Sequence, residues 1–456
     1  MKAAASGFSP SLTTDQPATF LTLLNDKQSY TFSRAQFSVE LDRLSRTSSM
    51  SITRVTEWRK LPLSLAELCI DTTLRCGQSF RWRKINDEWC CTLYGRIVAL
   101  KQDPTHLHYK VTWPVKPTYP LTPPVTDGEA KGDDTEDLLR HYLSLKLDLK
   151  SLYEQWSDAD PNFRKRAPDF GGVRMLSQDA WEALICFICS SNNNISRISQ
   201  MVHKLCTHYG PLVGHVGDEP FHDFPTPEAL TGNSVEAHLR ELGFGYRAKY
   251  IAQTASIIVN DRPKGWFKSL TNPENPCYRN FPGCSELPQC TYKEAHEQLL
   301  QLAGVGPKVA DCVCLMGLGW GEAVPVDTHV WQIAQRDYKF GKTKTKTFNK
   351  TMYDAVGDHF RELWGKYAGW AHSVLFTADL KTFSQQTIKK EEEGKGQTMI
   401  VKKEFTLDED APVLGKKRKL MKAKVKVEVD HELLDTMPKG PSAKRRRTRS
   451  QTQKIS

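Results

Sequence analysis

A glycine-rich turn between two apolar-periodic stretches constrains this fold more than any other feature of the sequence. The run 302–311 reads LAGVGPKVAD, and apolar residues recur at helical spacing before it, in 294–302, and after it, in 309–315. Two glycines allow a tight backbone turn, and proline is favoured in the first turn of a helix. The pattern therefore predicts two helices joined by a hairpin, with the second helix starting at Pro307.

The predicted hairpin suits a contact with phosphate. Amides at the start of a helix point outward and match a phosphate oxygen, and backbone contacts of this kind grip DNA without reading its sequence. We expect Gly304, Gly306 and Val309 to be the DNA-binding positions of this helix-hairpin-helix. Taken alone, the hairpin leaves open an ordinary corner between two helices.

Lys308 follows Pro307 directly and so stands in the first turn of the second predicted helix. A cation at this end of a helix is electrostatically disfavoured, which is a poor choice for stability alone. It suits a lysine that must lose a proton to act as an amine nucleophile. Simple phosphate binding by Lys308 is the alternative that the residues leave open.

Asp327 is the second candidate for catalysis. It lies in the run VPVDTHVW (324–331), where an aspartate before a helical pattern is expected to cap the helix. A carboxylate in this place would also stabilise positive charge on a sugar carbon and exchange protons with Lys308. His329 is a candidate phosphate contact, with a partly buried structural histidine as the alternative.

The hydrophobic pattern predicts an α+β fold, because its period changes once along the chain. Residues 56–155 are expected to form an antiparallel β-sheet domain, since apolar and polar residues alternate in short runs separated by turn signals. The alternating runs are 79–83, 89–93 and 107–111, and the turn signals are Asn86-Asp87 and Tyr94-Gly95.

Residues 156–381 carry helical periodicity, for example in 179–189, and are expected to form an all-α domain. A Pro-rich stretch, 272–290, is interpreted as an inserted loop. The flanks 1–55 and 382–456 lack a packed-core pattern and are expected to be largely disordered.

The charge distribution points to nucleic acid and to the nucleus. The net charge of +10 favours a polyanionic partner. Residues 388–456 hold 19 Lys and Arg against 11 Asp and Glu and so carry +8 of it, which leaves the rest nearly balanced. The basic runs 416–419 and Lys444, Arg445, Arg446 and Arg447 are expected to bind a nuclear import receptor or to tether DNA. A mitochondrial pool stays open.

The cysteines fit a reducing compartment. Twelve cysteines occur without an evident signal peptide, and no segment approaches the roughly 20 apolar residues of a membrane span, so we expect free thiols and no membrane association. A metal knuckle of Cys277, Cys284 and Cys290 is weighed against plain loop cysteines, and no metal site is predicted.

Five blocks of the sequence, in order, resemble the eukaryotic 8-oxoguanine DNA glycosylases of the helix-hairpin-helix superfamily. The resemblance covers about residues 57–381. The blocks are GQSFRW (77–82), FICSSNNNI (187–195), GYRAKY (245–250), KVADC (308–312) and YAGWA (367–371).

The resemblance implies a bifunctional enzyme that excises oxidised purines from double-stranded DNA, as a monomer and without a cofactor. Lys308 would attack C1′ of the deoxyribose and form a Schiff base with Asp327 as its carboxylate partner, and β-elimination would then nick the strand. Superfamily members without this lysine only remove the base. Lys308 is therefore the reason to expect the nicking activity.

The resemblance also assigns a base pocket to Gly77, Cys312, His372 and Phe376. The Gly77 carbonyl would accept the N7–H that 8-oxoguanine has and guanine lacks, a polar mismatch that discriminates better than size. Cys312 and Phe376 would lie on the two faces of the base.

Four more residues are assigned to DNA through the resemblance. Asn192 and Tyr246 would fill the gap that the flipped base leaves. Arg197 and Arg247 would read the cytosine left without its partner.

One position departs from the family pattern. His372 stands where the family has a glutamine that reads the Watson–Crick edge of the base. A neutral imidazole offers one donor and one acceptor, and it can become charged near neutral pH. We therefore expect a broader purine range that includes formamidopyrimidine, and a fall in activity between about pH 7 and 6.

Three alternatives come from other classes of protein. They are a non-catalytic helix-hairpin-helix DNA-binding protein, a monofunctional alkylpurine glycosylase in which Asp327 acts alone, and a scaffold that acts through the basic tail. Lys308 at the hairpin exit, together with Asp327, favours the bifunctional enzyme, and the scaffold explains nothing in residues 57–381.

Overall fold

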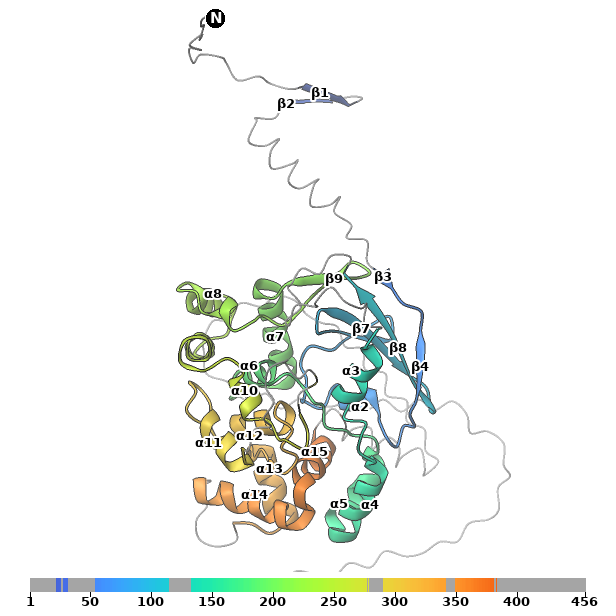
Figure 1. The fold of residues 1–456 in the computed structure, drawn as a ribbon, viewed down its shortest axis with the longest axis vertical. Helices are drawn as coiled ribbons and strands as arrows, with labels where there is room; N and C mark the ends of the chain where they lie inside the picture. The colour runs from blue at the N-terminus through green and yellow to red at the C-terminus, as the bar shows by residue number, and fades with distance from the viewer. Residues whose placement is uncertain are drawn as a thin grey trace, which may run out of the picture. The chain divides into compact units, whose positions relative to one another are not determined.

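An antiparallel sheet followed by a larger set of helices makes up the folded part of the chain (Figure 1). This arrangement confirms the predicted α+β fold. None of the helices that the structure describes is both long and apolar enough to cross a membrane. The computed structural model describes residues 54–114, 133–276, 278, 290–341, 349–380 and 383, and the backbone of 22–25 and 28–31.

The main sheet has the strand order β3-β8-β7-β6-β5, with β4 also paired to β8. Its strands are β3 (Arg54–Val55), β4 (Arg59–Pro62), β5 (Arg83–Ile85), β6 (Glu88–Leu93), β7 (Arg96–Gln102) and β8 (His106–Trp113). Two hairpins turn at the predicted dipeptides 86–87 and 94–95, where φ lies between 48° and 76°. Positive φ at both central residues matches the twist of antiparallel strands. A separate two-stranded ladder joins β1 (Thr22–Asn25) to β2 (Gln28–Thr31).

The predicted strand at 79–83 is wrong for most of its length. Residues 79–82 form an irregular connection, and β5 begins only at Arg83. The side chain of Arg81 is buried and forms ion pairs with Glu182 at 3.1 Å and Asp223 at 3.0 Å. The alternation in this run therefore reflects tertiary ion pairs and the burial of its aromatic neighbours, not a place in the ladder.

Apart from α2 (Ile70–Thr73), which lies between β4 and β5, the described helices follow the sheet in sequence, and a small hairpin of β9 (Leu212–Val216) with β10 (Glu219–His222) interrupts them. Short helical turns lie at Ala167–Phe170, Glu228–Leu230, Ile257–Asp261 and Gly365–Tyr367. The α-helices are α2 (Ile70–Thr73), α3 (Thr135–Tyr142), α4 (Leu149–Ala159), α5 (Pro161–Arg166), α6 (Ala180–Ser190), α7 (Ile195–Tyr209), α8 (Val235–Glu241), α9 (Arg247–Ser256), α10 (Trp266–Ser269), α11 (Tyr292–Leu299), α12 (Pro307–Met316), α13 (Thr328–Asp337), α14 (Lys350–Trp364) and α15 (Ala368–Asp379).

Helix α6 lies at the centre of the helical part and confirms the helix predicted at 179–189. It begins after Asp179, whose side chain accepts the N–H of Glu182 as an N-cap. All of its residues from Ala180 to Cys189 are buried. It packs against α12, so the helix that carries Lys308 rests on the most buried element of the domain.

Among the described residues, three hydrophobic clusters support this arrangement, and the smallest packs Cys90, Ile97 and Ala99 of the sheet against Val213 and Phe221 of the β9–β10 hairpin. The largest one gathers side chains from α4 to α15, including those of α6 and α12. The second one lies under the sheet and includes Leu138, Leu139 and Tyr142 of α3. Helix α3 therefore covers the sheet, whereas α4 belongs to the helical core.

Candidate active site

The predicted helix-hairpin-helix is formed by α11, the turn at 304–306 and α12. Gly304 has φ of 75°, and a Cβ there would lie 2.6 Å from the Tyr250 ring, so the turn requires glycine. Gly306 precedes α12, and a Cβ on it would meet no atom within 4 Å. Pro307 is the first residue of α12, as expected. The hairpin is thus packed on its Gly304 side and open at Gly306.

Val309 lies in the first turn of α12, but its side chain is buried. A contact with DNA at this position is therefore limited to the backbone amide, which has no partner within the first turn of a helix.

Lys308 is half-buried, and its amine lies between α12 and the end of α6. Its Nζ donates to Ser190 Oγ at 3.2 Å and lies 5.0 Å from the centre of the Phe187 ring. The Ser190 hydroxyl in turn donates to the Phe187 carbonyl at 2.7 Å, so its lone pairs are left to face the amine. Ser190 is a contact that the sequence patterns did not single out.

Asp327 is the N-cap of α13, as predicted. Its Oδ1 accepts the backbone N–H groups of His329 at 2.9 Å and Val330 at 3.0 Å. These two bonds hold the carboxylate in place at the start of the helix, where the helix dipole also favours negative charge. Asp327 and Lys308 line the same cavity, whose volume is about 50 Å³. Capping and a role beside the amine are therefore compatible.

The predicted base-pocket residues line this cavity as well. Gly77, Cys312, His372 and Phe376 all contribute to its wall. Gly77 has φ of 87°, a conformation that favours glycine. Burial raises the pKa of the Cys312 thiol to about 12, although the charge of Lys308 opposes this shift, so the side chain acts as a neutral wall. The structure thus brings these four positions into the wall of one cavity, and their contact with a base stays a prediction.

His372 is buried, and neither of its ring nitrogens has a hydrogen-bond partner among the described residues. Burial lowers its pKa to about 4, against the raising effect of Asp327 and together with the lowering effect of Lys308. The imidazole is therefore neutral between pH 7 and 6. The expected loss of activity through protonation of His372 in that range is wrong, because desolvation outweighs the nearby carboxylate.

The residues assigned to the DNA gap form one ridge beside the end of α6. Asn192 has φ of 48° and is exposed, and Tyr246 donates from its hydroxyl to the Ser191 carbonyl at 3.0 Å. Arg247 is buried and donates to the carbonyls of Ser191 and Asn192. Arg247 thus supports the turn that carries Asn192, and its contact with a cytosine stays a prediction.

Two further DNA candidates are exposed. Arg197 lies in the first turn of α7, next to the Asn192 turn. His329 follows the Asp327 cap, and its ring meets Phe376 edge-on at 6.0 Å between centroids. His329 therefore stands at the outer edge of the Lys308 cavity, where a phosphate contact is sterically open.

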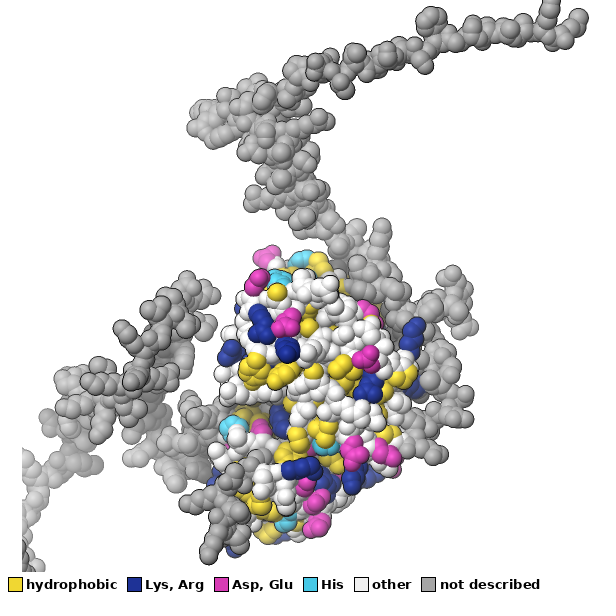
Figure 2. All heavy atoms as spheres, turned by 90° about the vertical axis from the view of Figure 1, so that its left-hand side faces the viewer, with side chains coloured by type: hydrophobic (Ala, Val, Ile, Leu, Met, Phe, Trp, Pro, Cys, Tyr) yellow, Lys and Arg dark blue, Asp and Glu magenta, His cyan; other side chains and the backbone are white. Residues whose placement is uncertain are grey.

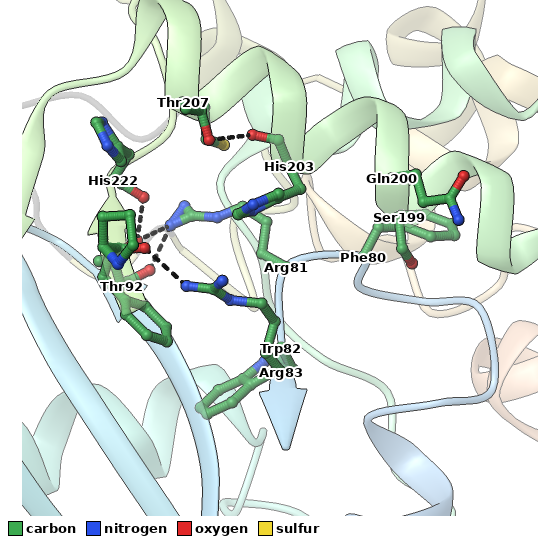
Figure 3. A pocket seen from close by; sticks show the side chains of 13 residues that line it. Phe80, Arg81, Trp82, Arg83, Thr92, Ser199, Gln200, His203, Thr207 and His222 are labelled. Carbon is green, nitrogen blue, oxygen red and sulfur yellow. Dashed lines mark hydrogen bonds between the residues drawn. The ribbon is translucent and has the colours of Figure 1, made fainter. Parts of the chain in front are cut away.

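A larger cavity, of about 250 Å³, lies apart from these residues, between the start of β5, α7 and β10 (Figure 3). Its charged groups already have partners: Arg81 pairs with Asp223 and donates to Thr92, and Arg83 pairs with Glu219 at 3.2 Å. The cavity marks the joint between the sheet and the helical part. The described residues that line it include the Cys206 thiol but no lysine and no carboxylate, so its size does not make it the reactive site.

The cysteine knuckle is not tested. Among the residues that the structure describes, no three His, Cys, Asp or Glu side chains are placed to hold one metal ion. Cys277 and Cys284 lie outside the described residues.

Two family models together match most of the folded part. Residues 60–184 match the 8-oxoguanine DNA glycosylase N-terminal domain, and residues 185–355 match the HhH-GPD superfamily of base excision DNA repair proteins. The boundary between the two matches falls inside α6.

Relatives and solved structures agree with these models. The chain is 39% identical to the N-glycosylase/DNA lyase of Saccharomyces cerevisiae over 353 residues, which are 72% of this chain and 88% of that protein. It is 34% identical to the N-glycosylase/DNA lyase OGG1 of Arabidopsis thaliana over 330 residues, 71% of this chain and 80% of that protein.

Two solved structures share its fold. One is MBOgg1 in complex with a low-affinity DNA ligand, with a TM-score of 0.57 and 25% identity over 74% of this chain and 99% of that one. The other is the apo 8-oxoguanine glycosylase/lyase of Clostridium acetobutylicum, with a TM-score of 0.55 and 23% identity over 71% and 98% of the two chains. The chain belongs to the eukaryotic 8-oxoguanine DNA glycosylase family, the N-glycosylase/DNA lyases of the helix-hairpin-helix superfamily.

Proposed function

We propose that this protein is a bifunctional DNA glycosylase and lyase that excises oxidised purines, 8-oxoguanine opposite cytosine and ring-opened formamidopyrimidine, in base excision repair. The observation that carries the proposal is that Lys308 and Asp327 line one cavity, with Lys308 in the first turn of α12, directly after the glycine-rich hairpin. Family membership supports both activities, because the relatives are N-glycosylase/DNA lyases.

The reaction uses the amine as the nucleophile and the carboxylate as its partner. The Lys308 nitrogen forms a bond to C1′ while the C1′–N9 bond breaks and the base leaves with the electron pair. The Asp327 carboxylate stabilises the positive charge that develops on the sugar, and it takes up and returns protons as the ring opens to a Schiff base. Loss of a C2′ proton then expels the 3′ phosphate and nicks the strand.

The flipped base enters the cavity between Cys312 and Phe376, with the Gly77 carbonyl at its N7–H. Lys308 and Asp327 line the same cavity, so the base would enter beside both reactive groups. His372 stays neutral and presents one donor and one acceptor to the Watson–Crick edge, in place of the family's glutamine.

Outside the cavity, the duplex is held by the hairpin turn at Gly306 and by the residues beside the end of α6 that are assigned to the DNA gap. Gly306 and the first amides of α12 take a phosphate, and His329 takes a second one. Asn192 and Tyr246 occupy the gap, while Arg197 and Arg247 contact the cytosine. Flipping costs a few kcal/mol, which the contacts in the pocket and the gap offset.

Matched duplexes test the proposal. Each carries one lesion opposite cytosine, either 8-oxoguanine, formamidopyrimidine or an alkylated purine, and base release is measured separately from strand nicking. We expect release and nicking on the first two substrates and neither activity in Lys308→Gln. Release of only the alkylated base without nicking would support a monofunctional enzyme, and binding without release would support a passive clamp.

We also propose that the protein acts in the nucleus as a monomer. The support is the basic run Lys444, Arg445, Arg446 and Arg447, which matches the chemistry that import receptors bind. A fluorescent fusion in which these four residues are replaced by alanine is expected to lose its nuclear enrichment. Unchanged nuclear enrichment, or a dimer mass in solution, would contradict the corresponding part of the proposal.

A further inference from the structure

A buried carboxylate lies directly behind the Lys308 cavity. Asp311 stands one helical turn after Lys308 on α12, and its side chain is 2% exposed. It is not among the residues that line the cavity. A carboxylate at this depth is costly unless hydrogen bonds compensate for the lost water.

Three side chains from two other helices surround Asp311. Tyr292 of α11 donates its hydroxyl to Oδ1, and Tyr353 of α14 donates its hydroxyl to Oδ2. His296 of α11 lies 3.5 Å from Oδ1. Asp311 therefore ties α12 to the helix before the hairpin and to a helix more than forty residues further along the chain.

The two tyrosines differ in what else they touch. The Tyr353 hydroxyl also accepts the backbone N–H of Val326 at 3.4 Å, and Val326 directly precedes Asp327. Tyr292 has no such bond to residues 324–327 within the described part of the chain. Within the described residues, only the Tyr353 hydroxyl therefore joins α12, which carries Lys308, to the segment 324–327, which ends at Asp327.

This gives a path of hydrogen bonds between the two elements that carry the reactive groups, α12 with Lys308 and the segment 324–327 with Asp327. It runs from α12 through Asp311 and Tyr353 to Val326, and Asp327 is the next residue. All three side chains on this path are buried. The path fixes the position of the 324–327 segment relative to α12. The two N-cap bonds then hold the Asp327 carboxylate at the start of α13.

We infer that Asp311 and Tyr353 are positioning residues that set the separation of the Lys308 amine and the Asp327 carboxylate. The inference rests on the proposed function of that pair. The expected effect on the rate follows from the cost of misalignment, since a shift of about 1 Å at a reacting group reduces a rate on the order of a hundredfold. Neither residue touches the reacting atoms.

The test compares two matched variants. Tyr353→Phe and Tyr292→Phe each remove one hydroxyl from Asp311 and keep the ring, but only Tyr353→Phe releases Val326. We expect Tyr353→Phe to lower the single-turnover rate of 8-oxoguanine release on the order of tenfold or more, and Tyr292→Phe to lower it less than threefold. Binding to a duplex with an uncleavable abasic analogue is expected to be unchanged in both, which separates positioning from substrate affinity.

Stability provides the control. Tyr292→Phe loses its bond to Asp311, and Tyr353→Phe loses its bond to Asp311 and the bond from Val326, so Tyr353→Phe is expected to fall at least as far in melting temperature. Rates are therefore compared at a temperature where both variants are folded. Asp311→Asn, which keeps the size of the side chain, is expected to slow release as Tyr353→Phe does. Equal rates in the two phenylalanine variants, or an unchanged rate in Tyr353→Phe, would overturn the inference. A Lys308→Gln protein that still nicks DNA would instead overturn the proposed function.

Discussion

Adding one methyl group at Gly304 is expected to destabilise the fold, for two reasons that the structure makes explicit. The residue has φ of 75°, and this conformation costs a residue with a Cβ roughly 1–2 kcal/mol. The new Cβ would also lie 2.6 Å from the Tyr250 ring, which must shift. Overpacking of this kind costs about 1–3 kcal/mol. Gly304→Ala is therefore expected to lower the free energy of unfolding by about 2–5 kcal/mol.

Gly306, two residues on, offers the matched control. Its φ of −102° and ψ of 179° suit any residue, and a Cβ there would meet open space. Gly306→Ala is therefore expected to leave stability unchanged or to raise it by roughly 0.4–1 kcal/mol through the unfolded state. The same methyl group stands where a phosphate would approach. Loss of one charge-assisted hydrogen bond weakens binding of an undamaged duplex by roughly tenfold or more.

Two measurements separate these effects. Thermal unfolding without DNA is expected to show a fall of at least about 4 °C for Gly304→Ala, at roughly 2 °C or more per kcal/mol, and none for Gly306→Ala. Fluorescence anisotropy with an undamaged duplex at one fixed salt concentration reports the binding. If Gly306→Ala binds as tightly as the unmodified protein, the hairpin is not the phosphate clamp.

Three further predictions concern single side chains. Because burial depresses the pKa of His372 to about 4, the unfolded chain binds its proton first, so stability falls as pH drops from about 6.5 towards 4, by up to roughly 3 kcal/mol. His141 and His203 also have a pKa lowered by burial, so His372→Gln is expected to reduce the fall in melting temperature over this range, and curves parallel to that of the unmodified protein would contradict the assignment. Ser190→Ala removes the acceptor for the Lys308 amine and is expected to slow base release several-fold at unchanged KM, with Ser190→Thr restoring the rate. Tyr246→Ala, at a ring that is 47% exposed, is expected to weaken binding of a lesion duplex while changing stability by less than about 1 kcal/mol, which anisotropy and thermal unfolding check.

Local rules were enough for the elements whose geometry is set by neighbouring residues. The hairpin, the start of α12 at Pro307 and the turns at 86–87 and 94–95 follow from the backbone preferences of glycine, proline, asparagine and aspartate. The Asp327 cap follows from its side-chain oxygen, which accepts the N–H groups of the first turn of α13. The pocket positions came from the family resemblance instead. Gly77 and His372 are almost 300 residues apart, and no local pattern places them in one wall.

Tertiary contacts explain what the sequence did not reveal. The run 79–82 alternates like a strand, but the ion pairs of Arg81 with residues of the helical part keep it out of the ladder. His372 has an ordinary sequence context, and its burial, with a smaller contribution from the charge of Lys308, lowers its pKa. Ser190 and the path from Asp311 to Val326 join residues far apart in sequence, so their roles become visible only in three dimensions.

The bond between protein and sugar is the central claim, and locating it on one residue tests that claim most directly. The protein is incubated with a duplex that carries 8-oxoguanine opposite cytosine in the presence of borohydride, which reduces a Schiff base to a stable amine. Digestion and mass spectrometry then identify the modified peptide. The account predicts a deoxyribose remnant on the Lys308 side chain, and no adduct, or an adduct on another lysine, would contradict it.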